Sequence, residues 1–553
     1  MSTQQDTDVV IIGAGISGIY ALKQLRDAGF SAVALEAAPH HGGTWYWNSY
    51  PGARVDIESI EFSFKFDPEL EQEWTWSNRY AYQPELLRYL DYVVERYELA
   101  PHIRLGVRVT ETIFDETTTT WIIRSEEGDT FTARHVVLAT GALSSPKSPV
   151  IEGLDTFEGD ILRSVRWPAG GYDFAGKKVG VVGTGSTGVQ IITAIAPELG
   201  ENLYVLQRTA PFVVPAHNAP LSEDFVASVK DAYDTWREAE QAHFGGFVAV
   251  DYEIGSSPTA MTLEASEEER FAEFEKRWHS GGLCFYSSFG DLLMNIDANQ
   301  ELAKYLQQKA REQVAGHPME EKFIPRDYMP LTRRLIVEDG YYESYTVHGA
   351  NLVDVGGDNT LEVVPGGVKV NGELIELDTL ILATGFEGVI GAPASMEIRG
   401  AGGIELKDAW QDAPSTLLGY AVHGFPNMYL VNGAGCPGAL TQAFTLSEFQ
   451  VEWVRDLLTF AREKGHTRIE ASPAGQTAWT THLDDVLNMT LFPHSASWYM
   501  GSNVEGRKPM PMLYLGGFPA YKRHSLEQRD QEFPDVAFDG NTERLREQPV
   551  FTL

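Results

Sequence analysis

The sequence is poor in cysteine, with Cys284 and Cys436 as its two cysteines among 553 residues. They form no Cys-x-x-Cys motif, and no His/Cys cluster has the spacing of a zinc site. These absences argue against a disulfide framework, a dithiol redox centre and a metal site. So little cysteine is typical of a reducing compartment, and we expect the protein to be cytoplasmic.

Positive charge is also scarce, because 43 Lys and Arg stand against 78 Asp and Glu and leave a net charge of −35. Nucleic-acid binders carry a basic face and anionic membranes repel acidic chains, so we expect neither partner. The sequence has no apolar run of about 18 residues that would predict a membrane span. The polar, acidic start of the chain does not resemble a signal peptide. We interpret the acidity as favouring solubility, and we expect a monomer or a weak oligomer.

Glycine is plentiful, and its first cluster sits in a nucleotide-binding pattern. Asp8–Ile12 reads as a buried strand, Gly13-Ala14-Gly15-Ile16-Ser17-Gly18 follows at once, and a helical pattern covers Ile19–Ala28. A second strand, Ala32–Leu35, leads to Glu36. Together these features make the full dinucleotide-binding pattern in its required strand–turn–helix context.

Each member of this pattern has a physical task. Gly13 permits the tight turn, Gly15 lets a pyrophosphate approach the backbone, and Gly18 lets helix and strand pack closely. The unpaired N–H groups of the helix start then face the phosphates. Glu36 can accept hydrogen bonds from both ribose hydroxyls, which favours a cofactor without a 2′-phosphate.

The pattern recurs later in the chain. Val179–Val182 reads as a strand, Gly183-Thr184-Gly185-Ser186-Thr187-Gly188 as the turn, and a helix follows through Ile195. The next strand, Leu203–Leu206, ends in Gln207-Arg208-Thr209, so a base replaces the acid. A guanidinium can pair with a 2′-phosphate. A lone glycine box is often a plain tight turn, but two boxes with oppositely charged partners predict FAD at the first and NADPH at the second.

The order of segments predicts the domains. Two further strands end in small-residue turns at Gly141 and Gly385, where we expect the chain to cross between domains, and the stretch 216–332 is rich in acids and helix formers. The expected fold is α/β, with two Rossmann-type dinucleotide-binding domains and a helical insertion in the NADPH domain. We expect the tail after Tyr521 to be irregular, lying on the surface or partly mobile. The predicted bounds are 1–145 and 386–553 for the FAD-binding domain, 146–215 and 333–385 for the NADPH-binding domain, and 216–332 for the insertion.

One stretch resembles a motif of the Baeyer–Villiger monooxygenases, and the resemblance extends over nearly the whole chain. The residues from Gly42 to Asp56 read G-G-T-W-Y-W-N-S-Y-P-G-A-R-V-D. They match the family's Gly-Gly-x-Trp … Tyr-Pro-Gly-x-x-x-Asp motif at every defining position. On residues alone, Asp56 is equally well explained as a turn residue after Pro51-Gly52.

A second stretch, from Phe157-Glu158-Gly159 to Trp167-Pro168, is similar to the family's linker motif Phe-x-Gly-x-x-x-His-x-x-x-Trp-Pro. The histidine is replaced by Arg163, while the spacing of the other members is intact. Arginine keeps a donor and a positive charge but does not titrate near neutrality. We therefore expect this departure to affect domain coupling and NADPH handling more than the oxygen chemistry.

Two more stretches carry the resemblance. Arg333-Arg334, ahead of Gly340-Tyr341-Tyr342-Glu343, stands where the family has its Lys-Arg pair, which implies that Arg334 is the active-site arginine and Arg333 a 2′-phosphate ligand. The segment from Ser497 to Lys508 is similar to a C-terminal segment whose tryptophan, here Trp498, covers the nicotinamide.

The resemblance implies an NADPH- and O2-dependent flavin monooxygenase that converts ketones to esters or lactones through a C4a-peroxyflavin. The peroxide must stay deprotonated to attack a carbonyl carbon, and a fixed cation beside it lowers its pKa. Arg334 supplies that cation without losing its own proton, and Asp56 positions the guanidinium. Without the resemblance, we would interpret Arg334 as an ordinary ion-pair or phosphate-binding residue.

The resemblance and the glycine boxes together give three sets of candidate residues. The pocket for a small-molecule ketone is expected at Cys436, Pro437 and Leu440, and Cys436 has no basic sequence neighbour that would mark it as a nucleophile. The FAD set is Gly13, Gly15, Ser17, Gly18, Glu36, Thr44, Trp45, Trp47, Asp56 and Val109. The NADPH set is Arg54, Gly183, Thr184, Gly185, Ser186, Thr187, Gly188, Gln190, Arg208, Thr209, Arg333, Arg334 and Trp498.

Two other functions share much of this pattern. An N- or S-oxygenating flavin monooxygenase uses both cofactors, but its peroxide is protonated and attacks soft nucleophiles. Trp167-Pro168 and the Asp56 and Arg334 pair argue against it. A relative that only binds the cofactors, as a redox sensor, would explain Arg163, but the intact second glycine box and Arg333-Arg334 argue for an enzyme.

Overall fold

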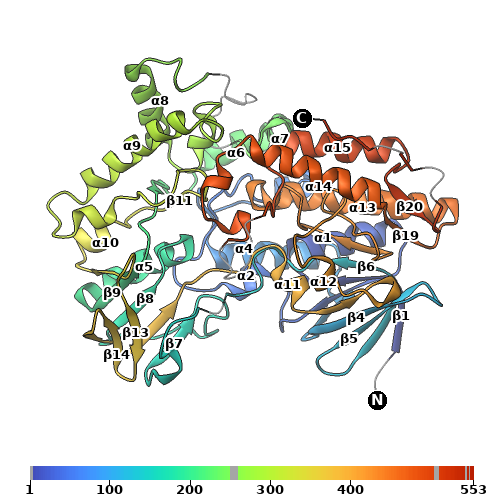
Figure 1. Cartoon of the computed structure of the whole chain (residues 1–553), viewed down its shortest axis with the longest axis horizontal. Helices are drawn as coiled ribbons and strands as arrows, with labels where there is room; N and C mark the ends of the chain where they lie inside the picture. The colour runs from blue at the N-terminus through green and yellow to red at the C-terminus, as the bar shows by residue number, and fades with distance from the viewer. Residues whose placement is uncertain are drawn as a thin grey trace.

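The computed structural model describes residues 4–147, 149–248, 260–502, 510–541, 545–546 and 549–552. Two sheets built around parallel strands lie at opposite ends of the molecule, each covered by helices (Figure 1). A third, largely helical region rises above the second sheet. The predicted α/β fold with two Rossmann-type units and a helical insertion is confirmed.

The first sheet contains eight strands in the order β17-β4-β5-β6-β1-β2-β3, with β18 also paired to β6. Its central strand β1 is parallel to both neighbours, and Val9, Val10 and Ile11 in it are fully buried, as is usual inside a parallel sheet. The strands are β1 (Gln4–Ile12), β2 (Ala32–Glu36), β3 (Ile103–Leu105), β4 (Val109–Asp115), β5 (Thr120–Ser125), β6 (Thr130–Leu138), β17 (Glu397–Arg399) and β18 (Met428–Leu430).

Both ends of the chain contribute to this first unit. Helix α1 (Ile16–Asp27) lies beside α13 (Ala443–Lys464), where the Tyr20 hydroxyl donates a 2.7 Å hydrogen bond to Glu452 (Figure 1). Strand β18 also adds to the sheet from the late part of the chain. Helix α14 (Pro473–Asn488) and the antiparallel pair β19 (Ile469–Ala471) and β20 (Val536–Phe538) complete the unit.

The expectation of an irregular tail after Tyr521 was wrong for the described residues. Helix α15 covers Phe518–Asp530, and Ser525 and Gln528 in it are buried. Their polar groups are paired inside the protein, since the Ser525 carbonyl accepts from Trp453 and the Gln528 amide donates to Asp535. Internal pairing lets a polar segment be buried, which composition alone does not reveal.

The second sheet is parallel throughout, in the order β12-β9-β8-β16-β7. Helix α5 (Ser186–Leu199) follows β8. A separate three-stranded antiparallel sheet follows β12 in the sequence. The strands are β7 (Asp160–Arg163), β8 (Val179–Val182), β9 (Leu203–Gln207), β12 (Asn351–Asp354), β13 (Leu361–Val364), β14 (Gly367–Val370), β15 (Glu373–Glu376) and β16 (Thr379–Leu382).

The described chain between β10 (Val213–Val214) and β11 (Ile336–Val337) is mainly helical, and these two short strands pair at its base. Helix α8 begins with a capping box between Ser266 and Glu269, and its first acids are exposed near the positive end of the helix. The helices are α6 (Glu223–Asp231), α7 (Tyr233–Ala242), α8 (Glu267–Ser280) and α9 (Ile296–Gln313). No helix of the described residues is long and apolar enough to cross a bilayer.

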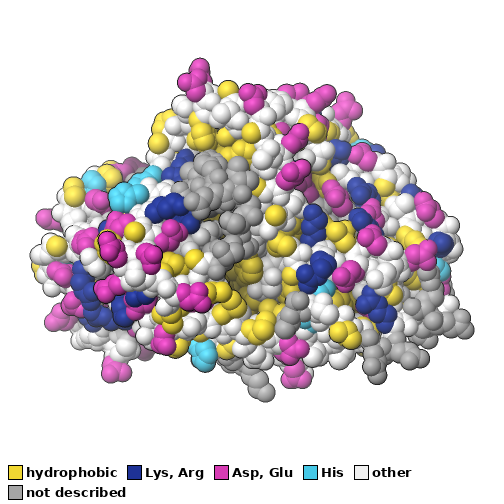
Figure 2. Space-filling view, turned by 90° about the horizontal axis from the view of Figure 1, so that it is seen from above, with side chains coloured by type: hydrophobic (Ala, Val, Ile, Leu, Met, Phe, Trp, Pro, Cys, Tyr) yellow, Lys and Arg dark blue, Asp and Glu magenta, His cyan; other side chains and the backbone are white. Residues whose placement is uncertain are grey.

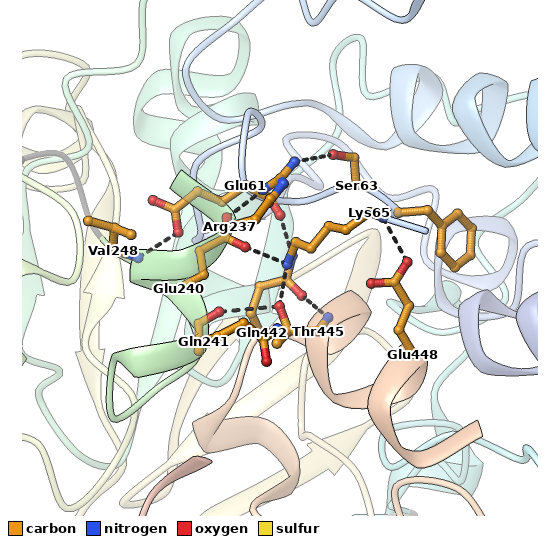
Figure 3. Close-up of polar contacts among 12 residues, drawn as sticks. Glu61, Ser63, Lys65, Arg237, Glu240, Gln241, Val248, Gln442, Thr445 and Glu448 are labelled. Atoms are coloured by element: carbon orange, nitrogen blue, oxygen red, sulfur yellow. Dashed lines mark hydrogen bonds and ion pairs between the residues drawn. The ribbon is translucent and has the colours of Figure 1, made fainter. Parts of the chain in front are cut away.

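Buried ion pairs tie the insertion to the first unit (Figure 3). Arg237 of α7 pairs with Glu71 at 2.6 Å and Glu240 at 2.5 Å, and Lys65 pairs with Glu240 at 2.8 Å. On the other side the Lys65 backbone N–H donates to Glu448 of α13 at 2.7 Å. The contact is therefore held by charges largely removed from water, where losing one partner is costly.

Candidate functional site

The first glycine turn has the geometry that a dinucleotide needs. Gly13 has a positive φ of 106°, and a Cβ on Gly18 would lie 1.9 Å from the Gly13 carbonyl oxygen. A side chain at Gly18 would therefore push helix α1 off β1. Glu36, at the end of β2, accepts hydrogen bonds from the N–H groups of Ala14 at 2.8 Å and Ala38 at 2.9 Å. Its carboxylate lies directly beside the turn.

The paired glycines of the first motif pack on this turn. Gly42 and Gly43 both have positive φ, and the Gly42 N–H donates to the Ala14 carbonyl at 2.8 Å. A Cβ on Gly43 would lie 2.9 Å from the Gly15 Cα. The loop after Glu36 thus reaches the backbone of the glycine box, which brings helix α2 (Thr44–Trp47), with Thr44, Trp45 and Trp47, against the first site.

The second glycine turn repeats this geometry. Gly183 has a φ of 108°, and a Cβ on Gly188 would lie 2.1 Å from the Gly183 oxygen. A Cβ on Gly185 would meet nothing within 4 Å, and both Gly185 and Ser186 are exposed at the start of α5. The turn therefore leaves open space for a phosphate against unpaired N–H groups. Thr184 anchors it by donating to the Thr209 carbonyl at 2.8 Å.

Arg208 and Arg333 lie close to one another at the edge of this second unit. Burial lowers the pKa of Arg333 below its usual value, and the positive charge of Arg208 adds to the effect, although Tyr328 and Asp327 oppose it. The Arg333 guanidinium stacks on Tyr328 at 4.3 Å, and its Nε donates to the Ala496 carbonyl. An anion bound between these two neighbouring arginines would relieve their mutual repulsion, so the pair suits a phosphate.

The two units meet at the middle of the first motif. The Tyr50 hydroxyl donates to Gln190 at 2.9 Å and contacts Thr187 at 3.4 Å, both on α5. A Cβ on Gly52 would lie 2.5 Å from the backbone carbonyl oxygen of Gln190, so glycine is required at this contact. The Gln190 amide in turn donates to the Arg54 carbonyl at 3.2 Å.

Arg54, a predicted NADPH contact, forms a buried ion pair. Its Nη1 lies 2.7 Å and 2.8 Å from the two carboxylate oxygens of Glu338, and its Nη2 donates to the Val337 carbonyl. Glu338 precedes the Gly340-Tyr341-Tyr342-Glu343 segment. The pair therefore fixes the end of the first motif against the chain that carries Arg334.

Asp56 and Arg334 form the two-point ion pair on which the sequence hypothesis depends. The Arg334 Nε lies 2.7 Å from Asp56 Oδ2, and Nη2 lies 2.9 Å from Oδ1. Burial alone would raise the pKa of Asp56, but the guanidinium outweighs it and holds that pKa below its usual value. Burial likewise opposes the charge of Arg334, whose pKa Asp56 nevertheless raises. The side chains remain 18% and 32% exposed, so the pair faces open space.

Three neighbours of this pair escaped the sequence analysis. The Ala439 carbonyl accepts a 3.2 Å hydrogen bond from Arg334 Nη1, and Tyr286 and Tyr499 lie close enough to act on its charge. Burial raises the pKa of Tyr499 to about 12, and its hydroxyl has no hydrogen-bond partner in the described structure. Tyr499 adjoins the predicted Trp498 and could have been found there, whereas a backbone carbonyl carries no sequence signal.

The predicted pocket residues follow the same segment. Cys436 and Pro437 are buried, while Leu440 is half-buried next to the Ala439 that contacts Arg334. Burial raises the pKa of Cys436 to about 12, which keeps it a thiol. A small cavity beside the pair is lined by Asp56, Glu58, Glu61, Tyr80 and Cys284, among others.

The remaining predicted residues are held by hydrogen bonds or by packing. Ser17 is hydrogen-bonded to Ser447 and Asn432, Trp45 packs edge-on against Phe62, and Val109 is buried in β4. Trp498 packs against Gly388, where a Cβ would lie 2.6 Å from its ring. The rest of the C-terminal motif, residues 503–508, lies outside the described residues.

The linker strand ends beside the first motif. Arg163 is exposed at the end of β7, and three residues on, the Arg166 N–H donates to the Trp47 carbonyl at 3.0 Å. The Arg166 guanidinium also stacks on the Trp47 ring at 5.6 Å. The linker therefore contacts the predicted FAD-binding segment directly.

The chain is similar in sequence to several known proteins. Residues 7–231 match the family model described as pyridine nucleotide-disulphide oxidoreductase. The chain is 37% identical to cyclohexanone 1,2-monooxygenase of an Acinetobacter species, over 94% of this chain and 95% of the relative. It is 39% identical to a phenazine N-monooxygenase of Lysobacter antibioticus, over 95% and 96%. It is 35% identical to a Baeyer–Villiger monooxygenase of Pseudooceanicola batsensis, over 98% of each.

The solved structures agree with these sequences. The structure of cyclohexanone monooxygenase from Rhodococcus sp. Phi1 bound to NADP+ superposes with a TM-score of 0.92 at 36% identity, covering 98% of this chain and all of that one. The likeness spans both Rossmann-type units and the helical insertion. The chain belongs to the Baeyer–Villiger monooxygenase family.

Proposed function

We propose that this protein is an NADPH- and O2-dependent flavin monooxygenase that converts ketones to esters or lactones. The observation that carries the proposal is the two-point ion pair between Asp56 and Arg334, which is partly exposed. Such a pair fixes a permanent cation in position, which is the feature that separates this chemistry from attack by a protonated oxidant.

The residues present fit both cofactors. Glu36 beside the first turn suits an unmodified adenosine ribose, and the exposed Gly185–Ser186 backbone with Arg208 and Arg333 suits NADPH. The FAD contacts are proposed at Gly13, Gly15, Ser17, Gly18, Glu36, Thr44, Trp45, Trp47, Asp56 and Val109. The NADPH contacts are proposed at Arg54, Gly183, Thr184, Gly185, Ser186, Thr187, Gly188, Gln190, Arg208, Thr209, Arg333, Arg334 and Trp498.

When bound, the two cofactors supply a hydride and the means of activating O2. Arg334 then stabilises negative charge on oxygen at the reacting centre, because its guanidinium is prealigned and cannot lose its proton. Asp56 holds Nε and Nη2, and Ala439 accepts from Nη1, so the direction of the fork is set before the substrate arrives.

Other residues of the chain position the ketone and keep water away. Cys436, Pro437 and Leu440 are proposed to line the pocket, since Ala439 between them touches Arg334. Trp498 is proposed to cover the nicotinamide, and Arg208, Thr209 and Arg333 to retain NADP+ so that it shields the reacting centre.

The domain limits are also proposed from this layout. Residues 1–145 and 386–553 bind FAD, 146–215 and 333–385 bind NADPH, and 216–332 form the helical insertion. The pairing of β18 with β6 and of β7 with β16 supports this division. We further propose a cytoplasmic monomer or weak oligomer with no nucleic-acid or membrane partner, which the net charge of −35 and two buried cysteines outside any disulfide support.

A second candidate activity is N-oxygenation, because one relative is named a phenazine N-monooxygenase. That activity needs a nitrogen nucleophile rather than a carbonyl carbon. The fixed Asp56–Arg334 pair favours the ketone reaction.

One experiment separates the two candidate activities. The full chain with FAD and NADPH is incubated under ¹⁸O₂ with a panel of linear, cyclic, aromatic and steroid ketones, and in parallel with aromatic N-heterocycles. We expect ketone products that gain one labelled oxygen as an ester or lactone. Labelled N-oxides without any labelled ester would contradict the proposal, as would NADPH consumption that yields hydrogen peroxide with every ketone.

A further inference from the structure

A cluster of two histidines and one aspartate lies outside the machinery described so far. His40 and His41 belong to the loop between β2 and α2, and Asp91 lies on α4 (Gln83–Arg96), which packs against that loop. One ligand atom from each of the three residues lies within 4.8 Å of the others. We propose that these side chains bind one divalent transition-metal ion, with Zn²⁺ as the representative species.

The distances suit a small cation. His41 Nε2 lies 2.8 Å and His40 Nε2 lies 3.6 Å from Asp91 Oδ1. In a tetrahedral zinc site, with bonds of about 2.0–2.1 Å, ligand atoms lie about 3.3 Å apart, and the two distances bracket that value. Rotation of the two stacked imidazole rings would bring the three atoms into position, and water can take the fourth place.

His41 and Asp91 form an ion pair when His41 is protonated. Among the described residues, neither His41 Nε2 nor Asp91 Oδ1 has a hydrogen-bond partner, although both atoms are buried and lie 2.8 Å apart, because their alignment is not that of a hydrogen bond. Buried polar atoms without a hydrogen bond lower the stability of a protein, and a cation bound to both atoms would remove that penalty.

The orientation of His40 is fixed as in metal sites. Its Nδ1 lies 2.8 Å from the His41 carbonyl oxygen, and because a carbonyl only accepts, Nδ1 must be the protonated nitrogen. Nε2 therefore keeps its lone pair and points toward Asp91. Metal-binding histidines commonly have their second nitrogen bonded in this manner. The His40 ring is also stacked between His41, at 4.5 Å, and Tyr46, at 5.7 Å.

The ligand set selects the class of metal. Two imidazoles and one carboxylate suit Zn²⁺, Co²⁺, Ni²⁺ or Cu²⁺, whereas Mg²⁺ and Ca²⁺ prefer oxygen ligands. A bound ion would join the loop that continues into Gly42 and Gly43 to helix α4. Its effect is therefore expected on the stability of the flavin-binding half and is independent of the proposed oxygenation.

The test uses the full chain with FAD, without a polyhistidine tag and stripped of metal by a chelator. Zn²⁺ binding is measured by competition with a chromophoric zinc indicator, in excess Mg²⁺. We expect one site that His41→Gln and Asp91→Asn each weaken by about tenfold or more. His466→Gln is the matched control, because His466 pairs with Asp539 at 2.7 Å without a second imidazole in that pair. It should leave the affinity unchanged.

Equal Zn²⁺ affinity in wild type, His41→Gln and Asp91→Asn would overturn the proposal, and so would displacement by Mg²⁺. A measurement on the unaltered protein guards against misfolded variants. Cu²⁺ bound at one equivalent should show coupling to two imidazole nitrogens by electron paramagnetic resonance. Coupling to fewer than two imidazoles would equally refute the site.

Discussion

At the scale of single residues, side-chain charge is the basis for proposing FAD at the first glycine turn and NADPH at the second. Glu36 stands beside the first glycine turn, while Arg208 occupies the corresponding place in the second and lies near Arg333. The carboxylate would repel a 2′-phosphate and the arginines would attract one. We therefore expect the preference for NADPH over NADH to depend on these few side chains.

Arg208→Ala should weaken NADPH binding by about 2–3 kcal/mol, because a charged hydrogen-bond pair to the phosphate is lost. NADH binding should change little. The dissociation constants of both coenzymes are measured by titration, with Arg326→Ala as the control, since Arg326 is an exposed arginine paired with Glu321. Equal losses for the two coenzymes would show that Arg208 does not contact the 2′-phosphate.

The carboxyl group of Glu58 gives a second prediction at this scale. Burial raises its pKa from 4.5 to about 7, despite the opposing charge of Arg79. The folded protein therefore keeps a proton that the unfolded chain loses between pH 4.5 and 7. This contribution to stability is complete below pH 4.5 and disappears as the pH rises through 7.

Glu58→Gln should remove that pH dependence. Relative to the variant, wild type should lose about 2 kcal/mol of stability between pH 5 and pH 8. The interval from pH 5 to pH 7 contributes about 1.36 kcal/mol for each pH unit, and nearby charges such as Arg79 reduce the sum. Unfolding is followed by circular dichroism at both pH values. Parallel pH profiles of wild type and variant would show that Glu58 is ionised throughout.

At the scale of elements, the glycine turns were the most predictable part of the sequence. The expected strand Val179–Val182 coincides with β8, and the strand expected at Ala32–Leu35 differs from β2 by one residue. Strand β1 starts at Gln4 rather than Asp8, because its polar first residues pair with β6 through backbone hydrogen bonds rather than through an apolar pattern. Helix α1 starts at Ile16, since residues of the glycine box form its first turn.

The candidate site was predictable to a similar degree. The Asp56–Arg334 pair followed from the motifs, whereas Tyr286 and the Ala439 carbonyl did not, since their place depends on how distant segments pack. Helix α15 was missed because its buried polar side chains are paired with residues elsewhere in the chain. Such pairing becomes visible once the fold is known.

The contact between α7 and the first unit depends on Arg237. Arg237→Met should destabilise the protein by about 3 kcal/mol, because Glu71 and Glu240 remain buried without this partner. Arg311→Met on α9 serves as the control, since its pair with Glu321 is exposed and should contribute less than about 1 kcal/mol. Urea unfolding measures both. A loss for Arg237→Met no larger than the control would mean that the ion pairs of Figure 3 do not hold this contact.

At the scale of the whole molecule, the chain is acidic without a separate basic face in the view of Figure 2. There, Lys and Arg side chains are scattered among Asp and Glu, and apolar side chains lie between them. The Arg54–Glu338 and Asp56–Arg334 pairs instead lie where the two Rossmann-type units meet. Tyr50 and Gly52 contact α5, the Arg54–Glu338 pair follows, and the Asp56–Arg334 pair comes next along the same motif.

The central claim is that Arg334, held by Asp56, is needed for oxygen transfer to the ketone but not for binding or reducing the flavin. The measurement is the yield of ¹⁸O-labelled ester or lactone from Arg334→Ala, together with the rate of flavin reduction by NADPH. We predict flavin bound and reduced as in wild type, with product formation lower by at least about 10²-fold. Wild-type product yield from Arg334→Ala would contradict the account.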